Sequence, residues 1–204
     1  MDSLELRKLV PTDLELDLFE DKAWISVVAF SMEKVRPKNL PAFPPLSNFD
    51  EINIRTYVKY NGKPGVYFLS IEAGNKLSCQ MAKSLSELPY RFSKMNRKVG
   101  NYHSNNLQYS DDFSLDFKIS QKIIEKTEWD KWLTERYALF QENKGFINQF
   151  EIHHLEWPIK NIEIQKLKID YPRFNSLMDE SPDLVHYSKG VQVIAWGKKK
   201  TKMS

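Results

Sequence analysis

The stretch that decides the fold runs from Glu51 to Ala73 and reads EINIRTYVKYNGKPGVYFLSIEA. Apolar and polar residues alternate over Ile52–Tyr60, which is the period of a strand with two different faces. Residues 61–65 (NGKPG) have the composition of a hairpin loop, because glycine adopts the positive φ angles that such turns need. Val66–Ala73 continues as the partner strand. The sequence therefore predicts an antiparallel hairpin within a β-rich protein.

Segments outside the hairpin repeat the strand pattern, and short turns separate most of them. We expect about nine strands, at residues 14–19, 23–32, 52–60, 66–73, 90–99, 114–120, 146–154 and 159–169 and in a closing hairpin of 184–188 with 191–196. Apolar residues at helical spacing predict helices over 2–10, 75–88 and 128–140. Short turns favour antiparallel pairing. The sequence therefore predicts one α+β domain over residues 1–204, a mostly antiparallel β-barrel or curled sheet with two or three helices packed outside.

Three segments between these elements lack such patterns. Residues 36–45 carry four prolines, which lock φ and donate no backbone hydrogen bond, so an extended connection is expected there. Residues 101–106 are polar and are expected to be exposed. The lysine-rich end, Lys198–Lys202, predicts a frayed, solvated terminus more than a basic binding arm.

The composition is that of an ordinary globular protein. Of 204 residues, 41% are hydrophobic and 28% are charged, which argues against a disordered chain. The formal net charge of +3 is too small to indicate a nucleic-acid partner, and no apolar run approaches the roughly 20 residues of a membrane helix. The start of the chain has no signal-peptide pattern. We expect a cytoplasmic protein without nucleic-acid or membrane partners.

Common catalytic and cofactor motifs are absent from the sequence. The four histidines and the single Cys79 do not match zinc spacings, and there is no P-loop, dinucleotide fingerprint or nucleophile elbow. We therefore expect no metal and no cofactor. Cys79 cannot form an internal disulfide, and its position within a predicted helix favours a packed thiol over a nucleophile.

One face of the first hairpin strand carries polar groups that could act together. Glu51, Asn53, Arg55 and Tyr57 alternate along the strand, so they project from the same side. If that side lines a barrel interior, an acid, an amide, a guanidinium and a phenol converge, and the arginine suits a carboxylate. The alternative is the solvated face of an ordinary half-buried strand.

Two further clusters are candidates for a site. Arg136 and Tyr137 follow the tryptophan-rich helical segment, where Arg136 needs a partner; a structural salt bridge is its alternative role. His186 precedes a glycine turn and could act as a general acid or base, because its reference pKa is near neutral. A satisfied structural histidine is the alternative there.

Several phrases together resemble the YqjF-like family of uncharacterised bacterial proteins. They keep their order, cover most of the chain and are Leu16–Phe30 (LELDLFEDKAWISVVAF from Leu14), Val35–Pro41 (VRPKNLP), Asn53–Ser70 (NIRTYVKYNGKPGVYFLS), Leu88–Met95 (LPYRFSKM), Leu133–Leu139 (LTERYAL), His154–Pro158 (HLEWP) and Val185–Gly190 (VHYSKG). The family is similar to the acetoacetate-decarboxylase-like superfamily. The resemblance implies a β-barrel or β-cone with a central cavity and with helices packed outside.

The resemblance also bears on the chemistry. Decarboxylases of that superfamily form a Schiff base on a lysine that follows a proline and lies beside a second lysine. Here the matching stretch is Pro89-Tyr90-Arg91, and arginine cannot form the imine, so decarboxylation by that route is not expected. Glu51 matches an acidic position of the family, which implies a carboxylate that faces the cavity. Relatives carry a further N-terminal segment, so we expect this domain to lack an N-terminal strand found in them.

In the leading hypothesis, the barrel cavity binds a small, anionic ligand, and the protein is an enzyme acting on an organic acid or carbonyl compound. The candidate catalytic residues, as proton carriers, are Glu51, Tyr57 and His186. The candidate substrate-binding residues are Asn53, Arg55, Arg91, Arg136 and Tyr137. Among these, Arg55 and Arg91 would hold the anionic group.

In a second hypothesis, the barrel is the scaffold of a non-catalytic interaction or regulatory protein. The candidate partner surface consists of Tyr102, His103, Phe113 and the basic stretch Arg91–Lys98. A large exposed apolar patch with a filled interior favours this hypothesis, and an open cavity lined by Glu51, Arg55 and Arg91 counts against it. The sequence leaves open whether the chain forms a homo-oligomer.

Overall fold

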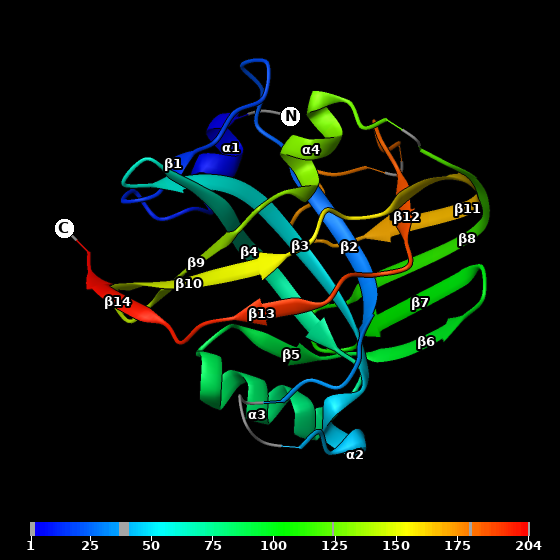
Figure 1. Cartoon of the computed structure of the whole chain (residues 1–204), viewed down its shortest axis with the longest axis horizontal. Helices are drawn as coiled ribbons and strands as arrows, with labels where there is room; N and C mark the ends of the chain where they lie inside the picture. Colours follow the sequence, from blue (N-terminus) through cyan, green and yellow to red (C-terminus); the bar gives the residue numbers. More distant parts are fainter. Residues whose placement is uncertain (1–2, 37–40, 124, 180, 204) are drawn as a thin grey trace.

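Residues 3–36, 41–123, 125–179 and 181–203 are described by the structure, a computed structural model, and they form four helices and fourteen strands (Figure 1). The helices are α1 (Ser3–Arg7), α2 (Pro44–Ser47), α3 (Lys76–Ser86) and α4 (Glu128–Thr134). The strands are β1 (Glu15–Leu16), β2 (Ile25–Met32), β3 (Phe49–Tyr60), β4 (Lys63–Ala73), β5 (Tyr90–Phe92), β6 (Lys94–Lys98), β7 (Asn101–Asn106), β8 (Asp111–Lys122), β9 (Ala138–Asn143), β10 (Phe146–His154), β11 (Ile159–Asp170), β12 (His186–Ser188), β13 (Val193–Ala195) and β14 (Lys199–Lys202).

The predicted hairpin is confirmed, and its two long strands cross the middle of the molecule (Figure 1). β3 and β4 pair antiparallel along almost their whole length. The turn residues Asn61 and Gly62 have φ angles of 51° and 76°, the left-handed conformation that asparagine and glycine tolerate best. The pairing shifts after Ile54, where β4 carries one extra residue, Leu69.

β3 and β4 belong to a nine-stranded sheet with the order β1-β3-β4-β9-β10-β13, in which β2 lies beside β3, β5 beside β4 and β14 beside β10. The second sheet has the order β12-β11-β8-β7-β6. Most pairs are antiparallel, and β4 pairs in parallel with β5 and β9. The mostly antiparallel β architecture with helices outside is therefore confirmed. Of the two expected forms, a barrel or a curled sheet, the described strands take the second, as two curled sheets (Figure 1).

The two sheets pack on each other through one face of β3. Ile52 and Ile54 share an apolar cluster with Tyr102, Phe113 and Tyr171 from the side of the second sheet. The expectation that residues 101–106 are exposed is wrong, because β7 pairs on both sides and turns every second side chain inward. Tyr102 and Phe113 are each 4% exposed, so they cannot form the partner surface proposed from the sequence.

The opposite face of β3 and β4 packs against α4 and against side chains of β9 and β10, which continue the same curled sheet. Tyr57 packs against Trp132 of α4 with ring centroids 4.4 Å apart. It shares an apolar cluster with Val66, Ile71 and Leu139. The polar residues that alternate with the inward isoleucines of β3 lie on this second, covered face, and not on a solvated one.

The helices differ from the prediction in number and length. The tryptophan-rich helix ends at Thr134 and not at Phe140, because Leu139 and Phe140 join β9 and pair with β4. α2 is a fourth helix that begins at the end of the segment expected to be extended; Pro44 and Pro45 fit its first turn, where a helix needs no backbone donor. Residues 37–40 of that segment lie outside the described residues. No helix in the described part of the chain is long and apolar enough to cross a membrane.

The end of the chain pairs differently from the prediction. β12 and β13 do not form a hairpin with each other, since β12 pairs with β11 and β13 pairs with β10. The lysine-rich end is not frayed but forms β14 on β10. Lys198 and Lys200 reach the Glu87 carboxylate at 2.7 and 2.8 Å. Local alternation predicts a strand, but it does not specify the neighbour of that strand in the sheet.

Candidate functional site

Glu51 lies at the centre of a buried polar group on the covered face of β3. Its side chain is almost fully enclosed, with the residue 3% exposed. The Tyr90 hydroxyl donates to Oε2 at 2.9 Å, and Asn53 Nδ2 donates to Oε1 at 3.3 Å. Burial raises the pKa of Glu51 to about 7, although both hydrogen bonds lower it. Glu51 can therefore hold or release a proton near neutral pH.

Local structure explains how Tyr90 reaches Glu51. The Asn75 side chain caps α3 by accepting from the backbone N–H groups of Leu77 and Ser78, and α3 ends shortly before β5. β5 then pairs in parallel with β4 and places Tyr90 opposite Ile71. Burial raises the pKa of Tyr90, and the Glu51 carboxylate raises it further, so the phenol stays a proton donor.

Arg55 and Tyr57 continue the same face toward α4. Arg55 Nη2 and the Tyr57 hydroxyl both donate to the carbonyl oxygen of Leu133, each at 3.3 Å. The Tyr57 hydroxyl also lies 2.6 Å from Ser26 Oγ. The Arg136 guanidinium joins this group, with its Cζ 5.0 Å from the centre of the Tyr57 ring.

Arg136 is held by a buried ion pair, the alternative role considered for it. Its Nη1 lies 2.5 Å from the carboxylate of Asp17, its Nε donates to the Trp132 carbonyl at 2.6 Å, and both charged side chains are about 5% exposed. Lys59 lies 3.0 Å from the other oxygen of Asp17. Burial lowers the pKa of Arg136, and Asp17 raises it. The pair anchors the end of α4 to the beginning of the chain.

Three buried polar atoms on this face have no hydrogen-bond partner among the described residues. They are Asn53 Oδ1, Arg55 Nε and Arg136 Nη2. A buried polar group without a partner costs about 1–3 kcal/mol, and more when it is charged. Two guanidinium donors and one amide acceptor are thus available on the face that also carries Glu51. A bound molecule with a carboxylate could satisfy the two donors.

Arg91 does not join this group. It follows Tyr90 on a strand, so the two side chains point to opposite faces. Arg91 Nη1 donates to Ser70 Oγ at 3.1 Å, and the guanidinium lies over the Tyr109 ring at 4.5 Å. The fold brings Arg55 near Arg136, but the side chain of Arg91 lies on the other side of the sheet.

His186 and Tyr137 also lie away from Glu51. His186 Nε2 is 3.0 Å from Asp130 Oδ1 at the start of α4, and burial lowers the pKa of His186 although Asp130 raises it. The Tyr137 hydroxyl donates to Glu135 at 2.8 Å, and its ring stacks on His154 at 4.8 Å. Neither side chain has a described contact with Glu51.

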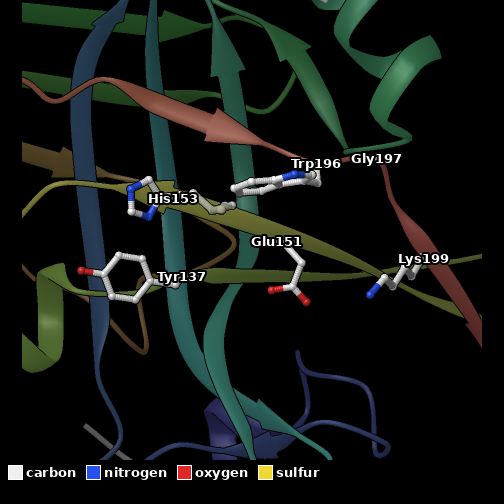
Figure 2. Close-up of a pocket in the computed structure, with 7 residues that line it drawn as sticks. Tyr137, Glu151, His153, Trp196, Gly197 and Lys199 are labelled. Carbon is white, nitrogen blue, oxygen red and sulfur yellow. The ribbon is translucent and has the colours of Figure 1, made fainter. Parts of the chain in front are cut away.

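Tyr137 instead borders a surface hollow of about 410 Å³ at the junction of β10, β13 and β14 (Figure 2). Figure 2 shows the rings of Tyr137, His153 and Trp196 around Glu151, with Lys199 at the far end. A second hollow, of about 350 Å³, is lined by residues that include Lys126, Glu156 and Trp157. Neither hollow is lined by Glu51, Arg55 or Arg91.

Some site residues were not singled out from the sequence. Tyr90 carries a signal, since it directly follows Pro89 in the stretch Pro89-Tyr90-Arg91 that matches the decarboxylase lysines. Asp17 carries no such signal, because its partner Arg136 lies 119 residues away.

Cys79 is buried, its thiol donates to the Arg91 carbonyl at 3.2 Å, and burial raises its pKa to about 11, as expected for a packed thiol. Within the described residues, no group of three or more metal-ligating side chains occurs.

The two curled sheets define an acetoacetate-decarboxylase-like fold. An acetoacetate decarboxylase-like enzyme from Sphingomonas wittichii RW1 superposes with a TM-score of 0.60 at 12% identity, over 100% of this chain and 88% of that one. An acetoacetate decarboxylase gives 0.59 at 14% identity, over 98% and 83%. The enduracididine biosynthesis enzyme MppR, in complex with pyruvate, gives 0.55 at 12% identity, over 100% and 85%. At these identities the similarity establishes the fold alone.

Sequence comparison gives the family. Residues 1–192 match the DUF2071 family, "Uncharacterized conserved protein (COG2071)", and the chain belongs to that family. It is 35% identical over 199 residues to the uncharacterized protein YqjF of Bacillus subtilis (strain 168), covering 94% of this chain and 82% of that protein. The resemblance to YqjF-like proteins and to the decarboxylase-like fold is confirmed.

Proposed function

We propose that the covered face of β3 binds a small organic acid that carries a carbonyl group, and that Glu51 transfers a proton to or from it. The observation that carries this proposal is the pair of buried guanidinium donors without partners, Arg55 Nε and Arg136 Nη2. They lie on the same face as a carboxyl group whose pKa is raised to about 7. Anion binding and proton transfer thus have separate groups in one buried region.

In the binding step, the carboxylate of the ligand accepts from Arg55 and Arg136. Charge-assisted hydrogen bonds of this kind are the strong ones, and burial strengthens them. The Tyr57 ring lies within 5.9 Å of both guanidinium carbons and limits how they can move. Asn53 Oδ1 is free to accept from a hydroxyl or enol of the ligand.

In the chemical step, Glu51 acts as a general base or acid on a carbon or oxygen next to the carbonyl group. A group with a pKa near 7 is suited to give and take a proton at neutral pH. Tyr90 donates to Glu51 and belongs to the stretch Pro89-Tyr90-Arg91, which contains no lysine. Tyrosine and arginine form no imine, so enolisation, hydration or dehydration fits these residues better than decarboxylation through a Schiff base.

Pyruvate is a suitable probe, because it combines a carboxylate with a carbonyl and is the ligand of one structural neighbour, MppR. Calorimetric titration should show pyruvate binding to the wild-type protein. Arg55→Gln should weaken binding at least tenfold, as expected for loss of one buried hydrogen bond to a charge. Arg97→Gln, on β6 and paired with Asp50, is the matched control and should bind as the wild type does. Equal affinity in the Arg55→Gln and wild-type proteins would refute the binding step.

Proton transfer can be tested separately from binding. In D₂O, the wild-type protein should accelerate exchange of the pyruvate methyl protons, followed by proton NMR. Glu51→Gln should abolish the acceleration while pyruvate still binds. Exchange that is equally fast with both proteins would exclude Glu51 as the proton carrier.

A second candidate function, a non-catalytic interaction protein, is favoured by the exposed edge of the larger sheet. β13 lies at the end of the strand order, and its apolar side chains are open to solvent, with Val193 55% and Ile194 58% exposed. Trp196 next to it is 53% exposed. A second copy of the chain could pair with this edge. Sedimentation velocity should then show self-association that Ile194→Lys removes, and a wild-type protein that stays monomeric at all concentrations would refute it.

A further inference from the structure

A second buried polar group lies between the two sheets, on the opposite face of the larger sheet from Glu51. It contains two carboxylates, Glu72 of β4 and Asp111 of β8, each only 1% exposed. Ser93 donates to Glu72 Oε2 at 2.5 Å, and Ser70 donates to Oε1 at 3.4 Å. Buried carboxylates are rare unless they are paired, so their partners need to be identified.

Two arginines face these carboxylates. Arg173 lies 2.5 Å from Asp111 Oδ2 and forms an ion pair with it. Arg91 donates to the Ser70 hydroxyl at 3.1 Å. Both guanidinium carbons lie 4.5 Å from the centre of the Tyr109 ring. Tyr109, Arg91 and Arg173 are partly exposed, so they form the outer side of the group.

The two guanidinium groups differ in their ion-pair partners. Asp111 neutralises Arg173, but within the described ranges no carboxylate lies within ion-pair distance of Arg91. Burial raises the pKa of Glu72, and Asp111 raises it further, while the bond from Ser93 lowers it. Burial and the like charge of Arg173 lower the pKa of Arg91, but a guanidinium remains charged at neutral pH. Arg91 therefore carries a positive charge that no carboxylate of the described residues pairs with.

Some buried polar atoms of this group also lack hydrogen-bond partners. Arg173 Nε, Asn106 Nδ2 and Asp111 Oδ1 are buried atoms without a partner in the described part of the chain. Asn106 and Asp111 lie directly opposite each other on β7 and β8, so their side chains are neighbours. Two of the three unpartnered atoms are donors, which again favours an anion.

We infer that a small monovalent anion, inorganic or a carboxylate, binds between Arg91 and Arg173 beneath Tyr109. The anion accepts from both guanidinium groups and gives Arg91 a negatively charged partner. It thereby links β5 of the larger sheet to β8 of the second sheet through Arg173 and Asp111. This site shares no side chain with the proposed pyruvate site on the other face of β3.

Bromide is the probe, because its anomalous scattering gives its position directly. Wild-type crystals soaked in sodium bromide should show an anomalous peak in contact with Arg91 and Arg173. In solution, bromide should raise the unfolding temperature saturably at constant ionic strength. Arg91→Gln leaves the Arg173–Asp111 pair intact. It should abolish the anomalous peak and should raise at least tenfold the bromide concentration at which the rise in unfolding temperature is half complete. Arg97→Gln is the control and should retain both the anomalous peak and the rise in unfolding temperature.

Competition by sodium acetate distinguishes the two sources of the anion. Loss of the bromide peak in acetate assigns the site to carboxylates, and persistence assigns it to inorganic anions. A second variant, Arg173→Gln with Asp111→Asn, removes the ion pair without leaving a buried charge, and it should also lose the peak. Absence of a peak at Arg91, or a peak and a shift unchanged in Arg91→Gln, would overturn the inference. Arg55→Gln should not affect bromide, and Arg91→Gln should not affect pyruvate, so the two proposals can fail independently.

Discussion

At the scale of single residues, Glu51 ties stability to pH. Its pKa is raised from 4.5 to about 7 in the folded protein, mainly by burial. Between these values the folded protein holds a proton that the unfolded chain has lost, so stability falls as pH rises. The contribution is fully present below pH 4.5 and is lost as the pH passes through 7.

We therefore expect the wild-type protein to lose roughly 2–3 kcal/mol of unfolding free energy, relative to Glu51→Gln, between pH 5 and pH 8. Glutamine keeps the size of the side chain but cannot ionise. Urea unfolding at both pH values measures the difference. Parallel pH profiles for the two proteins would show that Glu51 is ionised in the folded state at pH 5.

Arg136 is the second residue with a strong expected effect. Arg136→Gln leaves Asp17 buried with Lys59 as its remaining ionic partner, and breaking a buried pair in this way costs about 3 kcal/mol. Urea unfolding should show that loss, and the double variant with Asp17→Asn should recover part of it. A change below about 0.5 kcal/mol in the single variant would mean that water reaches Asp17 and replaces the arginine.

At the scale of elements, the parallel pairing of β4 with β9 depends on Gly65. A Cβ atom at Gly65 would lie 2.6 Å from the carbonyl oxygen of Ala138 and 2.6 Å from a ring carbon of Phe140. The first of these is backbone and cannot move without breaking the sheet.

Gly65→Ala should therefore destabilise the protein by about 1–3 kcal/mol, the usual cost of overpacking. Thermal unfolding measures it. Gly197→Ala is the matched control, because nothing lies within 4 Å of the added carbon, and it should leave the melting temperature nearly unchanged. Equal melting temperatures for both variants would show that β4 and β9 are farther apart than described.

Some helices and strands can be predicted from sequence patterns alone, and others cannot. Strict alternation and a turn with asparagine and glycine predict β3 and β4, because both signals are local. The sequence does not predict where α4 ends, because residues 138–140 suit a buried helix face as well as a strand, and the neighbouring β4 decides between them. The sequence does not predict the partners of β12, β13 and β14 for the same reason, because those partners lie far away in sequence.

At the scale of the whole molecule, β3 separates two polar regions. One face carries Glu51, Asn53 and Arg55, and the other face packs through isoleucines on the second sheet. The alternation of β3 predicts the first region from the sequence. It cannot predict that Tyr90 and Arg136 complete that region, or that Arg91 joins Glu72 and Asp111 instead, because those contacts depend on how distant strands pair.

The binding of a carboxylate to the covered face of β3 is tested most directly by a crystal structure of the wild-type protein soaked with pyruvate. We expect density for pyruvate with its carboxylate within hydrogen-bond distance of Arg55 Nε and Arg136 Nη2, and with its carbonyl end toward Glu51. Pyruvate bound only elsewhere, for example between Arg91 and Arg173, or no pyruvate at a concentration that saturates binding in solution, would contradict this assignment.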